Sequence, residues 1–338
     1  MFRRIGTRHH TVLSFSILIC IITILTIHLI KSSSDENFKE TTRSIIFSNR
    51  SLNIEDKRTS IDDVSILCLN MADYLDNEQN LPQSPLIYSP TFESPRIFRF
   101  PYRYSHWKSS SILPRALTPC EHNLAMQLLM FIDRICRENE IIYFMSEGTL
   151  LGSMRHHDII PWDDDIDIIL SYAQRQLFVD KIIQLNSTLI GLYLLKGKIE
   201  NKDYYKLYYK SNPSAGRYNW KFPFIDIFFY QQNETHLWNS KYPDAISKIK
   251  NVFPLILRPL GQLWVPSARK PSKFFQFDPF EDCVGHFWDH RNETGKEEIR
   301  MKCDQLKDVY PFVEQINKTD SVEVLKINNT IIHTVSFQ

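Results

Sequence analysis

Four aspartates occupy the five positions from 163 to 167, immediately before the apolar run at 168–170. The apolar run is typical of a buried strand, and carboxylates without partners are costly to bury. The fold must therefore provide partners or solvent for the aspartates at the start of this strand. Alternate residues of a strand share a face, so Asp163, Asp165 and Asp167 are predicted to point one way and Asp164 the other. Three carboxylates on one face repel one another unless water or a hard cation neutralises them. A solvated turn and a cation site are therefore the two interpretations of the run alone.

Another aspartate, Asp226, lies inside the apolar segment PFIDIFFY at 223–230. A carboxylate buried in a strand needs a partner, which favours a cation site. Carboxylates at the ends of neighbouring strands hold Mg²⁺ or Mn²⁺ in enzymes that cleave nucleotide phosphoanhydrides. Gly148 and Gly152 permit close backbone approach, and the N–H groups of a turn opening a helix at 149–154 are predicted to face a phosphate.

The hydrophobic periodicity predicts an α+β fold. A helix is predicted to begin at Thr118, the N-cap of a capping box with Glu121, because apolar residues then recur at helical spacing. Ser171 and Gln174 resemble a second capping box, which would begin a helix through about residue 185. The segments predicted as strands of one mixed sheet are 141–145, 166–170, 192–197, 204–210 and 224–230.

Residues 147–168, EGTLLGSMRHHDIIPWDDDIDI, resemble the signature of the LicD, fukutin and fukutin-related protein family. That signature is G-T-L-L-G-x-x-R followed by I-P-W-D-x-D-x-D, and the FIDIF element around Asp226 resembles its second hallmark. The resemblance extends over about residues 118–230. It implies a nucleotidyltransferase-like mixed β-sheet flanked by helices. It also implies transfer of a phospho-alcohol, such as phosphocholine or ribitol phosphate, from a CDP-linked donor to a glycan hydroxyl, with release of CMP.

The resemblance also assigns roles to residues of this chain. We expect Asp165, Asp167 and Asp226 to bind Mg²⁺ or Mn²⁺, and Asp163 to assist as a ligand or as a base toward the acceptor hydroxyl. The residues expected to hold the donor diphosphate are Gly148, Thr149, Gly152, Ser153 and Arg155.

Several neighbouring residues have two interpretations. Glu147 could join the site or cap the turn, and Trp162 could pack against the start of the strand or stack on the base. A group of basic residues before Asp226 could neutralise phosphate or lie on a solvated strand face. These residues are Lys206, Lys210, Arg217 and Lys221.

The C-terminal third contains a pattern with metal-ligand spacing. Cys283, His286, His290 and Cys303 follow a C-x2-H-x3-H-x12-C pattern that could bind zinc. In an oxidising compartment we expect a Cys283–Cys303 disulfide instead. Five cysteines remain once the one in the apolar N-terminal segment is set aside, so one is free or pairs with another molecule.

The N-terminal segment predicts a membrane anchor. Residues 11–30 carry no formal charge, and about 20 residues suffice for a helix to cross a bilayer. Arg3, Arg4 and Arg8 before the segment outweigh Lys31 after it, which places the N-terminus in the cytosol. A cleaved signal peptide is the alternative, but no small-x-small cleavage site follows the segment.

These features predict a single-pass type II protein of the Golgi or ER membrane with a luminal catalytic domain. The predicted segments are a cytosolic tail at 1–10, a transmembrane signal anchor at 11–30, a luminal stem at 31–111 and a catalytic domain at 112–338. Six N-glycosylation sequons support a luminal location. They begin at Asn49, Asn186, Asn233, Asn292, Asn317 and Asn328.

The net charge of +1 provides no global field for nucleic acid, so we expect no nucleic-acid partner. The expected partners are a CDP-linked donor, a glycan acceptor on a glycoprotein or glycolipid, and the membrane. Two alternatives to a LicD-like phosphotransferase remain. A DxD-type glycosyltransferase would not predict the upstream G-T-L-L-G-x-x-R or Asp226. A catalytically silent protein that binds glycans or partner transferases would be expected to lose a carboxylate of the site. This chain retains all four, at Asp163, Asp165, Asp167 and Asp226.

Overall fold

The computed structural model describes residues 87–88, 107–185, 187–197, 202–261, 263–275, 280–285, 287–316 and 322–337. All of them lie within one compact unit, Ser60–Gln338. The predicted anchor at 11–30 and most of the predicted stem lie outside the described residues. Within the described part of the chain, no helix combines the length and apolar character needed to cross a membrane.

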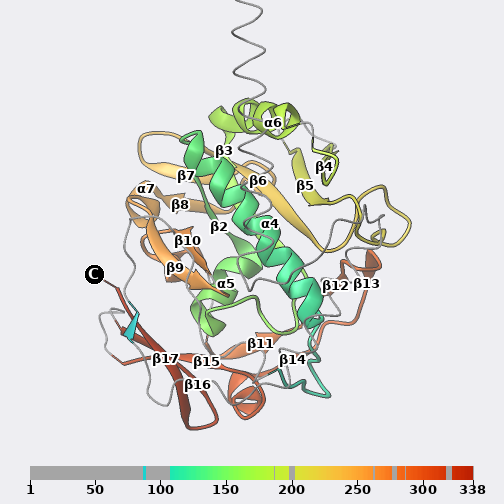
Figure 1. Ribbon diagram of the computed structural model, residues 1–338. Coiled ribbons are helices and arrows are strands. Elements are labelled where there is room, and N and C mark those ends of the chain that lie inside the picture. Colours follow the sequence, from blue (N-terminus) through green and yellow to red (C-terminus); the bar gives the residue numbers. More distant parts are fainter. Residues whose placement is uncertain are drawn as a thin grey trace, which may run out of the picture. The chain divides into compact units, whose positions relative to one another are not determined.

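A mixed seven-stranded sheet forms the centre of the unit (Figure 1). Its main strand order is β2-β3-β6-β5-β4, and β7 pairs with both β6 and β8. Neighbours β3 and β6 are parallel, whereas the other pairs are antiparallel. The strands are β2 (Tyr143–Met145), β3 (Ile166–Ser171), β4 (Ile190–Leu195), β5 (Tyr204–Tyr209), β6 (Phe224–Gln232), β7 (His236–Asn239) and β8 (Ile246–Lys248). All five predicted strands are present in this one sheet, so the predicted α+β class is confirmed.

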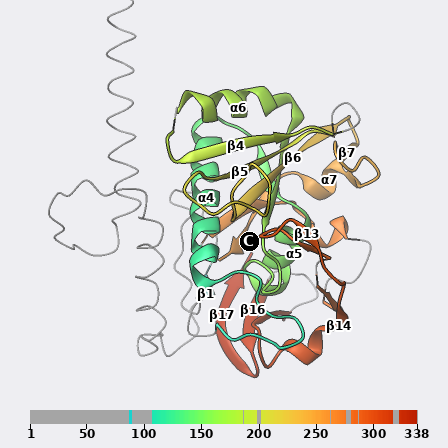
Figure 2. The ribbon, with the colours of Figure 1, turned by 90° about the vertical axis from the view of Figure 1, so that its right-hand side faces the viewer.

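Helices α4 (Pro119–Glu138) and α6 (Arg175–Gln184) cover one face of this sheet, and Figure 2 shows α4 running along it. The predicted capping box of α4 is confirmed. The Thr118 N–H donates to Glu121 Oε2 (2.8 Å), and the Glu121 N–H donates to Thr118 Oγ1 (3.3 Å). The apolar stripe of α4 packs in one core with Ile168 of β3 and Ile227 of β6.

The second predicted capping box is wrong. A short 3-10 helix, η2 (Tyr172–Gln174), precedes α6, and Ser171 makes no side-chain cap. The Gln174 amide instead accepts from the Ile142 N–H (2.8 Å) and donates to the Glu140 carbonyl (2.8 Å). Gln174 therefore fixes the turn before β2, which explains why it is not available to cap the helix.

Helix α5 (Glu147–His156) connects β2 to the loop before β3 and contacts β3, β9 and β15. The hairpin of β9 (Ile256–Leu260) and β10 (Leu263–Ser267) lies beside it, and the short helix α7 (Ile249–Val252) contacts β8 and η3 (Pro271–Phe274). A smaller core joins this layer to the sheet face opposite α4, and it contains Phe144, Ile169, Phe228 and Val252.

The C-terminal residues form a four-stranded sheet with the order β1-β17-β16-β15. Its strands are β15 (Phe312–Gln315), β16 (Val322–Ile327), β17 (Thr330–Ser336) and β1 (Ile87–Tyr88), which is parallel to β17. The Ser110 N–H also donates to the Tyr310 hydroxyl (2.8 Å). Two parts of the segment predicted as a stem, Ile87–Tyr88 and residues 107–111, therefore belong to the folded unit.

A buried polar network fastens the C-terminal sheet to α5. Glu323 accepts from both Arg258 (2.7 Å) and the ring of His157 (2.8 Å), and the other ring nitrogen of His157 lies 2.8 Å from His333 Nε2. All four side chains are buried. Arg258 and His157 pair with the Glu323 carboxylate, and a buried charge is tolerated in a core only when it is paired in this way.

Two short antiparallel pairs follow the hairpin in the sequence. They are β11 (Asp282–Val284) with β14 (Arg300–Lys302), and β12 (Trp288–Asp289) with β13 (Thr294–Gly295), followed by η4 (Cys303–Leu306). The predicted Cys283–Cys303 disulfide joins β11 to η4 and is confirmed, so these sulfurs are not zinc ligands. His286 lies outside the described residues. Cys120 is also disulfide-bonded, and Cys136 is free and buried.

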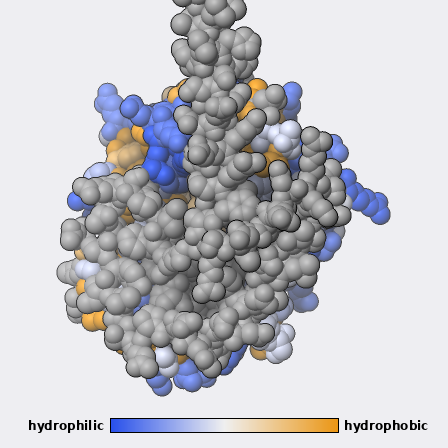
Figure 3. All heavy atoms as spheres, in the orientation of Figure 1, coloured by the Kyte–Doolittle hydropathy of each residue, from blue (hydrophilic) through white to orange (hydrophobic). Residues whose placement is uncertain are grey.

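Three of the six sequon asparagines lie in the described part of the chain, and all three are exposed: Asn233, Asn292 and Asn328. The others lie outside it. Large apolar side chains are exposed at scattered positions, including Leu177 and Ile183 of α6. Hydrophobic and hydrophilic patches accordingly alternate in the upper part of the space-filling view (Figure 3). Isolated apolar residues of this kind are normal on a protein surface.

Candidate metal and active site

The parallel pairing of β3 and β6 brings three predicted metal ligands together. Asp167 lies directly opposite Asp226, and Asp165 lies two residues before Asp167. One carboxylate oxygen from each of Asp165, Asp167 and Asp226 lies within 4.8 Å of the others. The exposed fractions are only 7%, 8% and 4%, respectively. We call these three residues and Asp163 the acidic cluster.

The cluster is electrostatically unfavourable on its own. Burial, followed by repulsion from Asp165, raises the pKa of Asp163 and of Asp167 well above the ordinary value. Burial also raises the pKa of Asp226, although Lys206 opposes this shift. A divalent cation would relieve the repulsion, and carboxylate oxygens are the ligands that Mg²⁺ and Mn²⁺ prefer. The donor set therefore fits such an ion.

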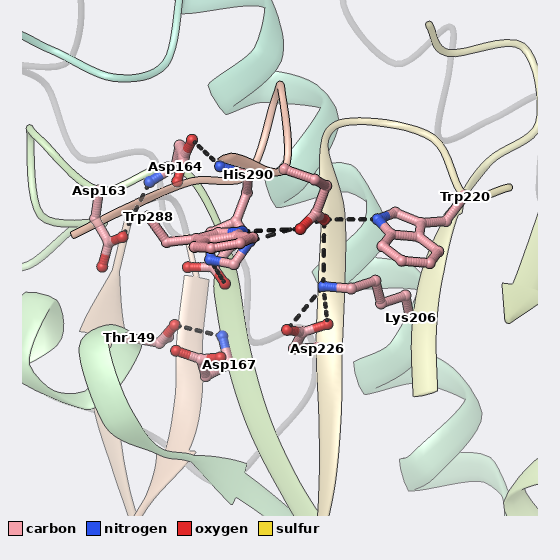
Figure 4. A network of polar contacts seen from close by, with 11 residues as sticks. Thr149, Asp163, Asp164, Asp167, Lys206, Trp220, Asp226, Trp288 and His290 are labelled. Carbon is pink, nitrogen blue, oxygen red and sulfur yellow. Dashed lines mark hydrogen bonds and ion pairs between the residues drawn. The ribbon is translucent and has the colours of Figure 1, made fainter. Parts of the chain in front are cut away.

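The start of α5 is built against the cluster. Thr149 Oγ1 accepts a hydrogen bond of 2.6 Å from the Asp167 N–H, which fixes the start of β3 (Figure 4). A Cβ atom on Gly148 would lie 2.5 Å from Asp163 Oδ2, so only glycine leaves that carboxylate its place. The helix begins at Glu147, two residues before the predicted start. Its first turn holds Gly148 and Thr149 against the cluster, and the N–H groups of residues 147–149 have no intrahelical acceptor.

The other three residues predicted to hold diphosphate are directed elsewhere. A Cβ atom on Gly152 would lie 2.5 Å from the Asp158 carbonyl oxygen, so this glycine allows α5 to pack on the following loop. The Ser153 hydroxyl donates to the Pro259 carbonyl (2.8 Å). The Arg155 guanidinium is buried and donates to the Asp282 carbonyl (3.2 Å). The start of α5 lies at the acidic cluster, and the continuous helix carries its second half away from it, toward β9 and β11. The structure therefore does not bring these side chains to the cluster.

His290 approaches the cluster from a segment 125 residues further along the chain. Its Nε2 atom lies 3.2 Å from Asp165 Oδ2, and its backbone N–H donates to Asp164 Oδ2 (3.0 Å). Burial opposes protonation of His290, but Asp165, Glu293 and Asp164 outweigh it and raise its pKa to about 9. Asp164, Asp165 and His290 form a second group whose ligand atoms lie within 4.8 Å of one another.

The expectation that Asp164 points away from the other aspartates is wrong. Strand β3 begins only at Ile166, so residues 163–165 do not follow the alternation of an extended strand. The Asp164 carboxylate faces His290, and burial with repulsion from Asp165 raises its pKa.

Lys206 is a buried cation that pairs with Asp226. It lies opposite Asp226 in the β5–β6 pairing, and its Nζ atom is 2.8 Å from Asp226 Oδ1 and 3.0 Å from Oδ2. The same nitrogen lies 3.9 Å from Glu293 Oε1. The indole N–H groups of Trp220 (2.7 Å) and Trp288 (2.9 Å) both donate to Glu293 (Figure 4).

The burial and contacts of Trp162 and the basic residues choose between the interpretations that the sequence left open. Lys206 is only 2% exposed, which excludes a solvated strand face for this residue. Arg217 is exposed. The exposed Lys210 donates to the Ser187 carbonyl, and the half-buried Lys221 donates to the Ser214 hydroxyl. Trp162 is 3% exposed, its indole donates to the Val284 carbonyl (3.0 Å), and its ring lies in a small core with Cys283 and Tyr310, so it is a packing residue.

Glu147 lies at the rim of the acidic cluster. Burial raises its pKa, while Lys241 and a hydrogen bond with Asn239 lower it. Glu147 in turn contributes to the raised pKa of Asp167. Ser146 is the N-cap residue of α5, so Glu147 joins the site rather than capping the turn.

A family model described as the LicD/FKTN/FKRP nucleotidyltransferase domain matches residues 140–270. The chain carries a LicD-family domain. The match includes Thr149, the aspartates at 163–167, Lys206 and Asp226, and it confirms the resemblance of the sequence motif. His290 and Glu293 lie beyond it, although they complete the site of the LicD domain.

One curated relative with a named activity supports this assignment. The lipopolysaccharide cholinephosphotransferase LicD of Haemophilus influenzae is 39% identical over 67 residues, which cover 20% of this chain and 25% of that protein. An uncharacterized protein of Rickettsia typhi is 48% identical over 215 residues, which cover 60% of this chain and 63% of that protein. The chain thus spans less than two thirds of the length of each of these relatives.

Proposed function

We propose that this protein is a metal-dependent phosphotransferase. In this proposal it transfers a phospho-alcohol, of the phosphocholine or ribitol-phosphate type, from a CDP-linked donor to a glycan of a glycoprotein or glycolipid. The observation that carries the proposal is the convergence of Asp165, Asp167 and Asp226 within 4.8 Å, inside a domain of the LicD family. The cholinephosphotransferase activity in the name of the Haemophilus influenzae relative supports the reaction type.

The proposed chemistry is a displacement at phosphorus. The acceptor hydroxyl oxygen forms a bond to the phosphorus atom that carries the alcohol, the bond from this phosphorus to the oxygen of CMP breaks, and CMP leaves. Asp165, Asp167 and Asp226 would hold Mg²⁺ or Mn²⁺, which stabilises negative charge on the diphosphate. Asp163 would accept the hydroxyl proton or serve as a further ligand.

The surrounding residues would hold these carboxylates in position. Thr149 fixes the backbone of Asp167, Lys206 pairs with both oxygens of Asp226, and His290 contacts Asp165. Each of the three ligands thus has its own partner, and a site held in this way loses little energy to reorganisation during the reaction.

Release of CMP from CDP-choline and CDP-ribitol by the purified full chain tests the reaction. The assay contains a glycan acceptor, and it is run with Mg²⁺ or Mn²⁺ and then with EDTA. Release should require metal and should be lost in Asp165→Asn and Asp167→Asn. It should survive in Asp180→Asn, which alters an exposed aspartate of α6. A folded chain that binds Mn²⁺ but uses only nucleotide sugars would favour a glycosyltransferase, and one that binds no metal would favour a silent binding protein.

We also propose that the protein is anchored in the Golgi or ER membrane with its catalytic domain in the lumen. The charge distribution around residues 11–30, the Cys283–Cys303 disulfide and the exposed sequons support this topology. Glycosidase treatment of the full chain from secretory-pathway membranes should increase its electrophoretic mobility. Replacement of Asn292 by Gln should remove one glycan, whereas an unglycosylated, protease-accessible domain would contradict the topology.

A further inference from the structure

Lys241, which directly follows β7 and Ser240, places its ammonium group among three aromatic rings. Its Nζ atom lies 3.6 Å from the ring centroid of Tyr204, 4.8 Å from that of Phe228 and 5.1 Å from that of Tyr242. Cation–π attraction holds an ammonium over such rings without using its hydrogen-bond donors. Among the described residues, no acceptor lies within hydrogen-bond distance of Nζ, although the backbone N–H of Lys241 donates to Asn239 (2.9 Å).

The aromatic rings lie on the same sheet face as the acidic cluster. Phe228 is two residues after Asp226 on β6, and Tyr204 is two residues before Lys206 on β5, so strand alternation directs all four side chains to one side. The Lys241 ammonium interacts electrostatically with Asp226, Asp167 and Glu147. It is therefore a cation at the rim of the cluster, whereas Lys206 lies within it.

Four of the other basic groups suggested for a phosphate already donate to protein oxygens. Arg155 donates to the Asp282 carbonyl, and Lys206 is paired with both oxygens of Asp226. Lys210 and Lys221 donate to neutral oxygens on exposed segments. The two negative charges of a donor diphosphate, added to the three carboxylates of Asp165, Asp167 and Asp226, exceed what one divalent cation balances, so a nearby ammonium with unused donors is the natural complement.

We propose that Lys241 binds the diphosphate of the donor, with its ammonium donating to a phosphate oxygen above the acidic cluster. This inference rests on the proposed function, because it assumes that a metal and a diphosphate occupy the cluster. The rings of Tyr204, Phe228 and Tyr242 keep the side chain at the site and limit the conformational entropy lost on binding. Charge-assisted hydrogen bonds to phosphate are stronger than neutral ones, so the contact should contribute measurably to affinity.

Calorimetry on the purified full chain tests the proposal, with Mn²⁺ titrated first and inorganic pyrophosphate titrated into the Mn²⁺-loaded protein. Lys241→Met keeps the length of the side chain and removes its charge. We expect pyrophosphate binding to weaken roughly 10- to 100-fold, the range for hydrogen bonds to charged groups. Lys241→Arg should restore affinity to within a few fold, and Lys250→Met, at an exposed position of α7, should bind like the unaltered chain.

The Mn²⁺ titration separates this role from a structural one. Removal of a cation beside the cluster should strengthen Mn²⁺ binding in Lys241→Met, whereas a folding defect would weaken both titrations. Equal pyrophosphate affinity in Lys241→Met and the unaltered chain, with Mn²⁺ binding intact, would overturn the role of Lys241 and leave the proposed function standing. An unaltered chain that binds neither Mn²⁺ nor pyrophosphate would overturn both.

Discussion

Gly148 and Gly152 belong to the same motif but should fail in different ways when each is replaced by alanine. At Gly148 the new Cβ would lie 2.5 Å from Asp163 Oδ2, and ordinary contact begins at 3.4 Å. The obstacle is the end of a side chain, so Asp163 can turn away by about 1 Å without unfolding the protein, and a misplacement of that size can cost about 100-fold in rate. Alanine is also the better helix former, so stability should be unchanged or slightly higher.

At Gly152 the obstacle is backbone. The added Cβ would lie 2.5 Å from the Asp158 carbonyl oxygen and 3.0 Å from the Ile160 nitrogen, and neither atom can rotate away. Overpacking of this kind typically costs about 1–3 kcal/mol of unfolding free energy. Gly152→Ala should therefore lower stability, and the activity per folded molecule should fall less than in Gly148→Ala.

CMP release and chemical denaturation, measured side by side on the two variants, check this contrast. We therefore expect Gly148→Ala to be stable but about 100-fold slower, and Gly152→Ala to be destabilised. Full activity of Gly148→Ala would refute the idea that Asp163 must occupy its observed position. Loss of stability in Gly148→Ala would show instead that the helix start cannot adjust.

Three further predictions concern charge and covalent structure. Lys206→Met leaves the buried Asp226 without its cation, so unfolding free energy should fall by about 3–5 kcal/mol, and added Mn²⁺ should reduce this deficit in denaturation curves. The pKa values of Asp163, Asp167 and Asp226 are raised above their ordinary value of 3.8, so protonation should begin to weaken Mn²⁺ binding well above that pH. Calorimetry from pH 8 to pH 5 would detect the loss of affinity. A Mn²⁺ affinity that does not change over this range would contradict the prediction. Reduction of Cys283–Cys303, separated by 20 residues, should cost about 3 kcal/mol of unfolding free energy on the chain-entropy account; unchanged denaturation in reductant would argue against it.

The convergence of Asp165, Asp167 and Asp226, the predicted metal ligands, could be predicted because local patterns determine it. Apolar runs identify β3 and β6 as strands, and aspartates within such runs must share a buried site if both strands enter one sheet. The parallel pairing then places Asp167 against Asp226. The capping box at Thr118 was also predictable, because all of its groups lie within four residues.

Contacts between distant segments could not be predicted in this way. His290 and Glu293 lie in the turn between β12 and β13, which has no periodicity, and nothing in their neighbourhood indicates a partner more than 60 residues away. Arg155 has the position expected of a phosphate ligand in the motif, but the direction of its side chain depends on where β11 packs. Lys206 required the β5–β6 register before its pairing with Asp226 became evident.

The loop closed by Cys283–Cys303 has a consequence for the maturation of the protein. Its residues are synthesised after the whole segment 140–270, yet His290 and Glu293 within it supply contacts to Asp165 and Lys206. A nascent chain that has emerged only to residue 270 would hold every aspartate of the cluster without these contacts. Completion of the site would then await synthesis of the residues up to Cys303, and oxidation of the cysteine pair would close the loop that carries His290 and Glu293.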